Sequence, residues 1–121
     1  LEKHPAVNWV NYAGLESSRY HGLAKKYMNG RASGILSFGI KGADEAGAKF
    51  IDALKMIVRL VNIGDAKSLA CHPASTTHRQ LNDEELASAG VSRDLVRLAI
   101  GIEHVDDILA DVEQALDASQ S

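Results

Sequence analysis

Cysteine is almost missing from this chain of 121 residues, in which Cys71 stands alone. One cysteine cannot form an internal disulfide, so no disulfide framework holds the fold, and a reducing compartment is the simpler expectation. Apolar runs long enough to cross a membrane are also missing. The net charge of -3 and the lack of any basic run argue against nucleic acid as a partner. We therefore expect a soluble globular protein of the cytoplasm.

The motifs of several common site classes are absent as well. The glycines show no phosphate-binding pattern, and no serine, histidine and acid follow one another as in a hydrolase triad. Cys71, His72 and His78 do not have the spacing of metal ligands, so we expect no metal site. Cys71 and His72 do not make a nucleophilic pair either, because neighbours in a strand point to opposite faces.

The chain is long enough for one domain with its own core and too short for two. It starts at Leu1 and not at methionine, and the stretch up to His4 reads as the last turn of a helix that Pro5 stops. These features suggest a piece of a longer protein.

Apolar spacing predicts a mixture of strands and helices. The expected strands are Ala6–Tyr12, Ile35–Ile40, Ile57–Ile63, Ser68–His72 and the stretch that follows Asp94. The expected helices run from Ser17 or Ser18 to Met28, from Asp44 to Met56, from the Asn82 capping box to Gly90, and from Val105 to Leu116. The connection Gly64–Lys67 is too short for a parallel crossover, and so is Pro73–Gln80 unless that loop spans the sheet. We therefore expect an α+β two-layer sandwich, with a mainly antiparallel sheet of about four strands, those that follow Gly30, and helices on one face.

The segment Asp94–Leu116 contains the best candidate for a functional residue. One face of its strand is apolar and is expected to lie under the helices, and the opposite face carries a single charge. The apolar face comprises Val96, Leu98, Ile100 and Ile102, and the opposite face Leu95, Arg97, Ala99 and Gly101. An arginine among small and apolar neighbours favours an anionic partner, most naturally a carboxylate bound through two parallel hydrogen bonds. A surface arginine without a ligand is the alternative that the pattern leaves open.

Several stretches then resemble one known family. VNIGDAKSLACHPASTTH at 61–78 and LVRLAIGIEHVDDILADVEQAL at 95–116 are similar to the C-terminal domain of the Cys/Met-metabolism family of pyridoxal-phosphate (PLP) enzymes. VNWVNYAGL, YHGLAKKYM and GILSFGIKG resemble that family too, so the likeness covers nearly the whole chain. The sequence around Asn62, NIGD followed by KSL and HPASTTH, most resembles the O-acetylhomoserine sulfhydrylase branch.

The resemblance implies a substrate role for three residues. Arg97 matches the arginine that binds the α-carboxylate of the amino-acid substrate. Asn62 matches a position whose backbone helps to hold the same carboxylate, and Thr77 matches a residue near that arginine. The family's cofactor lysine and phosphate-binding residues belong to a larger preceding domain that this chain lacks. We therefore expect no catalytic, cofactor-binding or metal-binding residue here, and an inactive isolated chain.

The intact protein implied by the resemblance is a homotetrameric transferase that uses PLP to make homocysteine from O-acetylhomoserine and sulfide. Other branches of the family, namely cystathionine γ-synthase, the cystathionine lyases and methionine γ-lyase, are alternatives. So are a free-standing amino-acid-binding regulatory module and a purely structural or dimerisation domain.

Overall fold

The computed structural model of the chain describes residues 1–76 and 80–121. Within these residues, five strands form one sheet in the order β1-β2-β5-β4-β3. Neighbouring strands run antiparallel except β3 and β4, which are parallel. The strands are β1 (Val7–Asn11), β2 (Ile35–Ile40), β3 (Val58–Arg59), β4 (Leu69–Cys71) and β5 (Leu95–Ala99). The expected α+β class and the mainly antiparallel sheet are confirmed.

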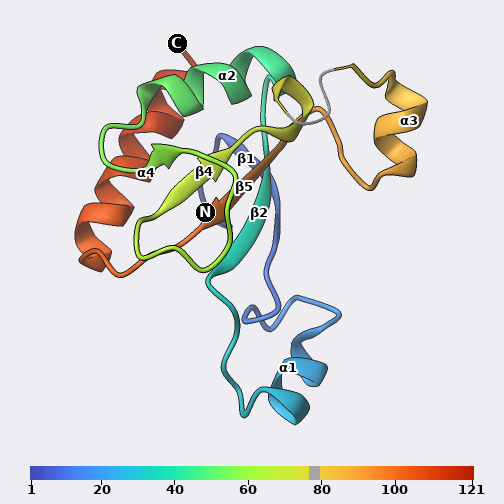
Figure 1. Ribbon diagram of the computed structural model, residues 1–121, viewed down its shortest axis with the longest axis vertical. Helices are drawn as coiled ribbons and strands as arrows, with labels where there is room; N and C mark the ends of the chain where they lie inside the picture. The colour runs from blue at the N-terminus through green and yellow to red at the C-terminus, as the bar shows by residue number, and fades with distance from the viewer. Residues whose placement is uncertain (77–79) are drawn as a thin grey trace.

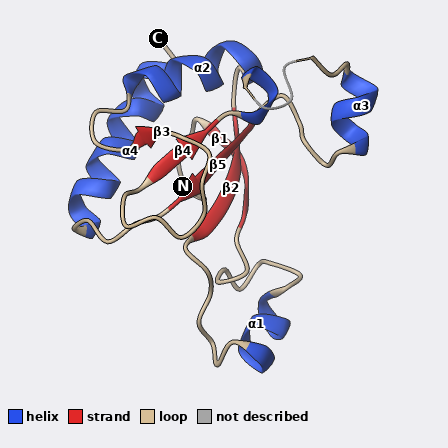
Figure 2. Cartoon of the chain, viewed as in Figure 1, coloured by secondary structure: helices blue, strands red, loops and turns tan. Residues whose placement is uncertain are grey.

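Two long helices of the described chain cover one face of the sheet, as expected (Figures 1 and 2). They are α2 (Ala43–Ala53) and α4 (Val105–Ser119). Phe38 of β2 meets Phe50 of α2 edge to face, with ring centroids 5.6 Å apart, and both rings are fully buried. Val96 and Leu98 of β5 belong to the same core. The apolar face of the central strand therefore points toward the helices.

Two long connections carry shorter helices away from this body (Figure 1). They contain α1 (His21–Tyr27) between β1 and β2, and the 3-10 turn η1 (Pro73–Ser75) and α3 (Asp83–Ser88) between β4 and β5. The predicted capping box is confirmed at α3, where Asn82 and Glu85 each accept a hydrogen bond from the other's backbone N–H. Arg93 ties α3 to the body because its guanidinium contacts both Asp83 and Asp44.

The sheet edge at β3 differs from the prediction. The expected strand Ile57–Ile63 pairs only over Val58–Arg59, and the chain then leaves the sheet as a loop, residues 60–68, with Ile63 exposed. The expected antiparallel connection to β4 is wrong, because β3 and β4 are parallel. Because β3 is only two residues long, the loop has a short distance to cover from the end of β3 back to the start of β4.

Helix α2 ends at Ala53, earlier than the predicted Met56. The backbone N–H groups beyond its end donate to the carboxylate of Asp111 on α4: Lys55 at 2.8 Å, Met56 at 2.9 Å and Ile57 at 2.8 Å. These N–H groups bond to the Asp111 carboxylate, which is distant in sequence, and not to helical carbonyls of α2. Local periodicity could not reveal that a distant carboxylate competes with the helix for these donors.

The N-terminal residues form a turn, closed by a 2.9 Å bond from the His4 N–H to the Leu1 carbonyl, and its assignment as the last turn of a helix stays a prediction. Two smaller predictions are wrong. Helix α1 begins at His21, because Ser18 accepts the N–H of Tyr20 in a preceding turn. Ile102 is 86% exposed, since β5 ends before it. No helix among residues 1–76 and 80–121 is long and apolar enough to cross a membrane.

Candidate functional site

Arg97 lies in the middle of β5, which is the central strand of the sheet. Because Val96 and Leu98 point into the core beneath the helices, Arg97 points to the opposite face. Its predicted position, on the face away from the helices, is confirmed. Ile100, which was expected to be buried with them, is half-buried just beyond the end of the strand.

Strand register places Arg97 in a row of four side chains across the sheet. Ser37 of β2 and Cys71 of β4 lie directly opposite Arg97 on either side, and Asn11 of β1 lies opposite Ser37. Directly opposed residues share a face, with Cβ atoms about 4.5–5.5 Å apart. We call these four residues the polar row. It forms the floor of a cavity of about 470 Å³.

The walls of this cavity come from segments far apart in sequence. Tyr12 and Tyr20 line it from the segment before α1, Val61 from the loop 60–68, Val91 from the connection that precedes β5, and Leu95 from the start of β5. A concave, largely apolar cavity with a few polar groups on its floor is the usual form of a small-molecule site. The long connections therefore serve to enclose the uncovered face of the sheet around Arg97.

The charge of Arg97 has no carboxylate partner within the described residues, whose ion pairs involve other cations. Arg93 is the useful contrast, because it contacts two carboxylates, with Asp44 at 2.8 Å. Burial raises the pKa of the neighbouring Cys71 thiol, although Arg97 opposes the shift. The thiol is therefore neutral at neutral pH and does not balance the guanidinium, which is always charged. An anion that enters the cavity meets an uncompensated positive charge.

The other two predicted site residues are less well defined by the structure. Asn62 lies in the loop 60–68, but its side chain is exposed and accepts the Ile63 N–H at 2.8 Å. Its neighbour Val61 lines the cavity, whereas Asn62 does not. Thr77 lies outside the described residues. The structure thus brings the Asn62 loop to the edge of the cavity, but not the Asn62 side chain into it.

Asn11 and Ser37 were not identified from the sequence. Both face Arg97's side of the sheet only because of the register of β1 on β2 and of β2 on β5. The alternation within each strand was visible, but the residue opposite each position was not. Every lysine of the chain is exposed and none lines the cavity, so Arg97 is the cation that the described residues place there.

Comparisons with known proteins agree with this picture. The family model for Cys/Met metabolism PLP-dependent enzymes matches residues 1–117. Homocysteine synthase of Schizosaccharomyces pombe is 56% identical over 119 residues, which are 98% of this chain and 28% of that protein. O-acetyl-L-homoserine sulfhydrylase 1 of Thermus thermophilus is 51% identical over 116 residues, which are 96% of this chain and 28% of that protein.

A solved structure is similar as well. It is a crystal structure of a protein from Campylobacter jejuni named O-acetylhomoserine (thiol)-lyase, with N′-pyridoxyl-lysine-5′-monophosphate. The TM-score is 0.86 at 44% identity, over 96% of this chain and 28% of that one. The chain therefore spans under a third of the length of the relatives it matches. Its fold and sequence place it in the Cys/Met metabolism family of PLP-dependent enzymes.

Proposed function

We propose that the chain is the C-terminal, substrate-carboxylate-binding domain of an O-acetylhomoserine sulfhydrylase. The intact protein would be a PLP-dependent transferase of the cytoplasm, a homotetramer, that makes homocysteine and acetate from O-acetylhomoserine and sulfide. Relatives named homocysteine synthase and O-acetyl-L-homoserine sulfhydrylase support the choice of reaction. The observation that carries the proposal is the uncompensated Arg97 on the floor of a cavity sized for a small molecule.

An amino-acid carboxylate suits this site chemically. A guanidinium presents two parallel N–H donors that match the two oxygens of a carboxylate, so it fixes the plane of the group as well as its position. The mainly apolar cavity walls lower the local dielectric and so strengthen this attraction. Orientation of the reacting substrate is what such a clamp contributes to catalysis. Asn62, through its backbone, and Thr77 are proposed to assist Arg97.

The described residues do not fit a PLP site of their own. PLP is held in its enzymes through a lysine, and every lysine of this chain is exposed and outside the cavity. We assign the cofactor, and the electron sink that it supplies, to another part of the longer protein. This chain's contribution is to bind and orient the substrate.

Replacement of Arg97 in the full-length protein tests the proposal. Loss of a charged hydrogen-bonding partner costs about 2–4 kcal/mol of transition-state binding, so Arg97→Ala should lower kcat/KM by roughly 30- to 1000-fold. Arg97→Lys should recover only part of the loss, because an ammonium binds the charge without fixing the carboxylate plane. Steady-state kinetics with O-acetylhomoserine measure both effects.

Arg31→Ala is the matched control, since Arg31 is exposed and does not line the cavity. It should leave kcat/KM unchanged. The melting temperature of Arg97→Ala should stay near that of the wild type, because Arg97 is not in the apolar core. Near-normal kinetics with a collapsed melting temperature would show that Arg97 is structural and would refute the carboxylate site.

A further inference from the structure

The loop 60–68 is one wall of the Arg97 cavity and is anchored at both ends. At its start the Leu60 N–H donates to the Ala70 carbonyl at 3.2 Å. Val61 lines the cavity, while Ile63 and Val61 are 66% and 50% exposed and contribute little packing. At the other end Ser68 is completely buried. The position of the residues between these two anchors therefore depends on what holds Ser68 as well as on the Leu60 bond.

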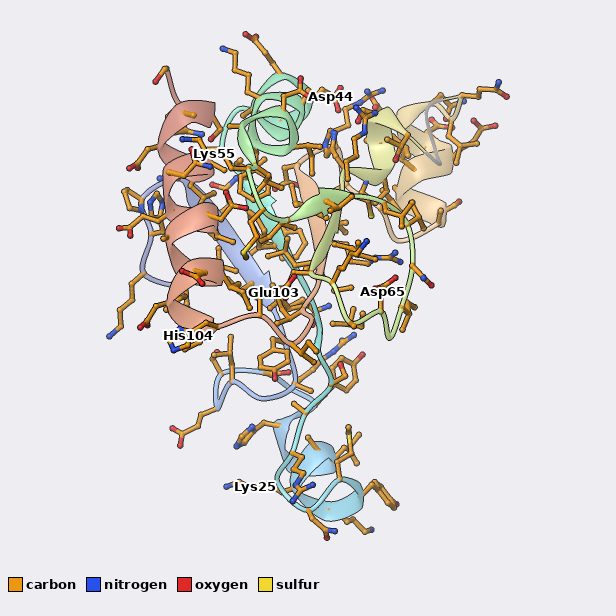
Figure 3. All side chains as sticks on the ribbon, turned by 60° about the vertical axis from the view of Figure 1, so that its left-hand side comes forward. Lys25, Asp44, Lys55, Asp65, Glu103 and His104 are labelled. Atoms are coloured by element: carbon orange, nitrogen blue, oxygen red, sulfur yellow. The ribbon has the colours of Figure 1, made fainter. Side chains whose placement is uncertain are left out.

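Ser68 is held by a carboxylate from the turn that precedes α4. One oxygen of Glu103 accepts the Ser68 N–H at 2.7 Å, and the other accepts the Ser68 hydroxyl at 2.7 Å. The same hydroxyl accepts the Gly101 N–H at 2.9 Å. We call this group, Ser68, Gly101 and Glu103, the loop clamp. Figure 3 shows Glu103 beside the turn into α4, and Asp65 farther out on the loop.

Backbone contact reinforces the loop clamp. The Ile102 N–H donates to the Ala66 carbonyl at 2.9 Å. A Cβ added at Gly101 would lie 2.6 Å from the Lys67 carbonyl carbon and 2.7 Å from the Ser68 nitrogen, closer than real Cβ atoms come. Glycine at position 101 thus lets two backbones touch. The loop has little freedom to shift along this contact while the clamp is intact.

The hydrogen bonds that Ser68 donates lower the pKa of Glu103, and the bond from the Ser68 N–H has a larger effect than the bond from the Ser68 hydroxyl. Glu103 is therefore ionised at neutral pH and accepts both bonds as a carboxylate. Arg97 and Glu103 both lie in the segment from β5 to α4, so the clamp joins the cavity wall to the strand that carries the floor.

We propose that Glu103 and Ser68 are positioning residues for the amino-acid substrate, acting through Val61 and the Asn62 backbone at the edge of the Arg97 cavity. The inference rests on the proposed carboxylate site and extends it. Loss of the clamp lets the wall move away from the bound substrate while Arg97 stays in place. The effect falls on substrate binding, and hence on KM, more than on kcat.

The test uses Glu103→Ala, Glu103→Gln and Ser68→Ala in the full-length protein. Glu103→Ala removes both acceptors and should raise KM for O-acetylhomoserine by roughly 5- to 50-fold, with kcat changed by less than about 3-fold. Glu103→Gln keeps the shape and one acceptor oxygen, so it should recover most of the loss. Glu113→Ala, an exposed glutamate on α4, is the matched control and should behave as the wild type.

Hydrogen exchange on the same samples separates positioning from general destabilisation. Glu103→Ala and Ser68→Ala should exchange faster over residues 60–68 and at the wild-type rate in β2 and α4. A normal KM for Glu103→Ala, when Arg97→Ala is impaired, would overturn the positioning role alone. Normal kinetics for both variants would overturn the carboxylate site and the positioning role with it.

Discussion

Asp111 and Arg97 are both charged side chains held within the domain, but the described structure supplies a full set of partners only for Asp111. Its carboxylate is buried and accepts three backbone N–H groups, and the Gln114 side-chain amide at 3.0 Å. Such a saturated carboxylate stabilises the fold and has little capacity left for a ligand. The guanidinium of Arg97 lies beside a neutral thiol and, unlike the Asp111 carboxylate, still has capacity to bind a ligand. At the scale of single residues, unmet hydrogen-bonding capacity distinguishes the candidate site from the framework.

The stability contributed by Asp111 should depend on pH. Burial alone would raise its pKa, but the N–H groups of Ile57, Lys55 and Met56 and the Gln114 amide together lower it. A carboxyl whose pKa is lower in the folded state stabilises the fold above its unfolded pKa, about 4, and loses that contribution as the pH falls through the folded value. Asp111→Asn should therefore lower the unfolding free energy by about 2–4 kcal/mol at pH 7 and by less near pH 3.

Urea unfolding of wild type and variant at both pH values measures the effect. Asp52→Asn is the control, because Asp52 is exposed and should change stability little at either pH. An equal loss for Asp111→Asn at pH 7 and pH 3 would mean that the ionised carboxylate is not what holds the end of α2.

At the scale of elements, two helical glycines predict opposite outcomes for the same substitution. Nothing lies within 4 Å of a Cβ added at Gly22 in α1, so Gly22→Ala should stabilise the protein by roughly 0.5–1 kcal/mol through helix propensity. A Cβ at Gly47 in α2 would lie 2.6 Å from Nε2 of His72, whose ring is buried and donates to the Arg93 carbonyl at 2.7 Å. Gly47→Ala should destabilise by about 1–3 kcal/mol.

Thermal melts of the two variants side by side decide the comparison, each serving as the control for the other. Destabilisation by both substitutions would show that α1 does not tolerate alanine for a reason other than local space. Stabilisation by both would show that His72 moves aside easily and that the α2–η1 contact is loose.

The same elements show what the sequence could and could not predict. Strand β2 (Ile35–Ile40) and the Asn82 cap follow from local signals, periodicity and a side chain that reaches the next turn. The end of α2 and the shortness of β3 depend on Asp111 and on a loop that the clamp holds, and these partners are distant in sequence. Arg97 was identifiable because its charge interrupts an apolar pattern. Asn11 and Ser37 interrupt nothing and became visible only through register.

At the scale of the whole molecule, the sheet separates the apolar core on one side from the candidate site on the other. Helices α2 and α4 bury one face and form the core (Figure 1), while the segment before α1, the loop 60–68 and the residues before β5 line the cavity on the other face. The polar row lies on that second face, and every lysine lies on the outside. The chain thus carries the proposed carboxylate site, and none of its lysines lines that cavity.

This division predicts how the isolated chain responds to PLP. Incubation with the cofactor, reduction with borohydride and peptide mapping should label several exposed lysines at low and similar levels, because each reacts as an ordinary surface amine. The isolated chain should also show no sulfhydrylase activity. The full-length protein, treated in the same way, is the control and should be labelled stoichiometrically at one lysine outside this chain. Stoichiometric labelling of a single lysine within the isolated chain would contradict the assignment of the cofactor to another domain, and would make this chain more than a substrate-binding part.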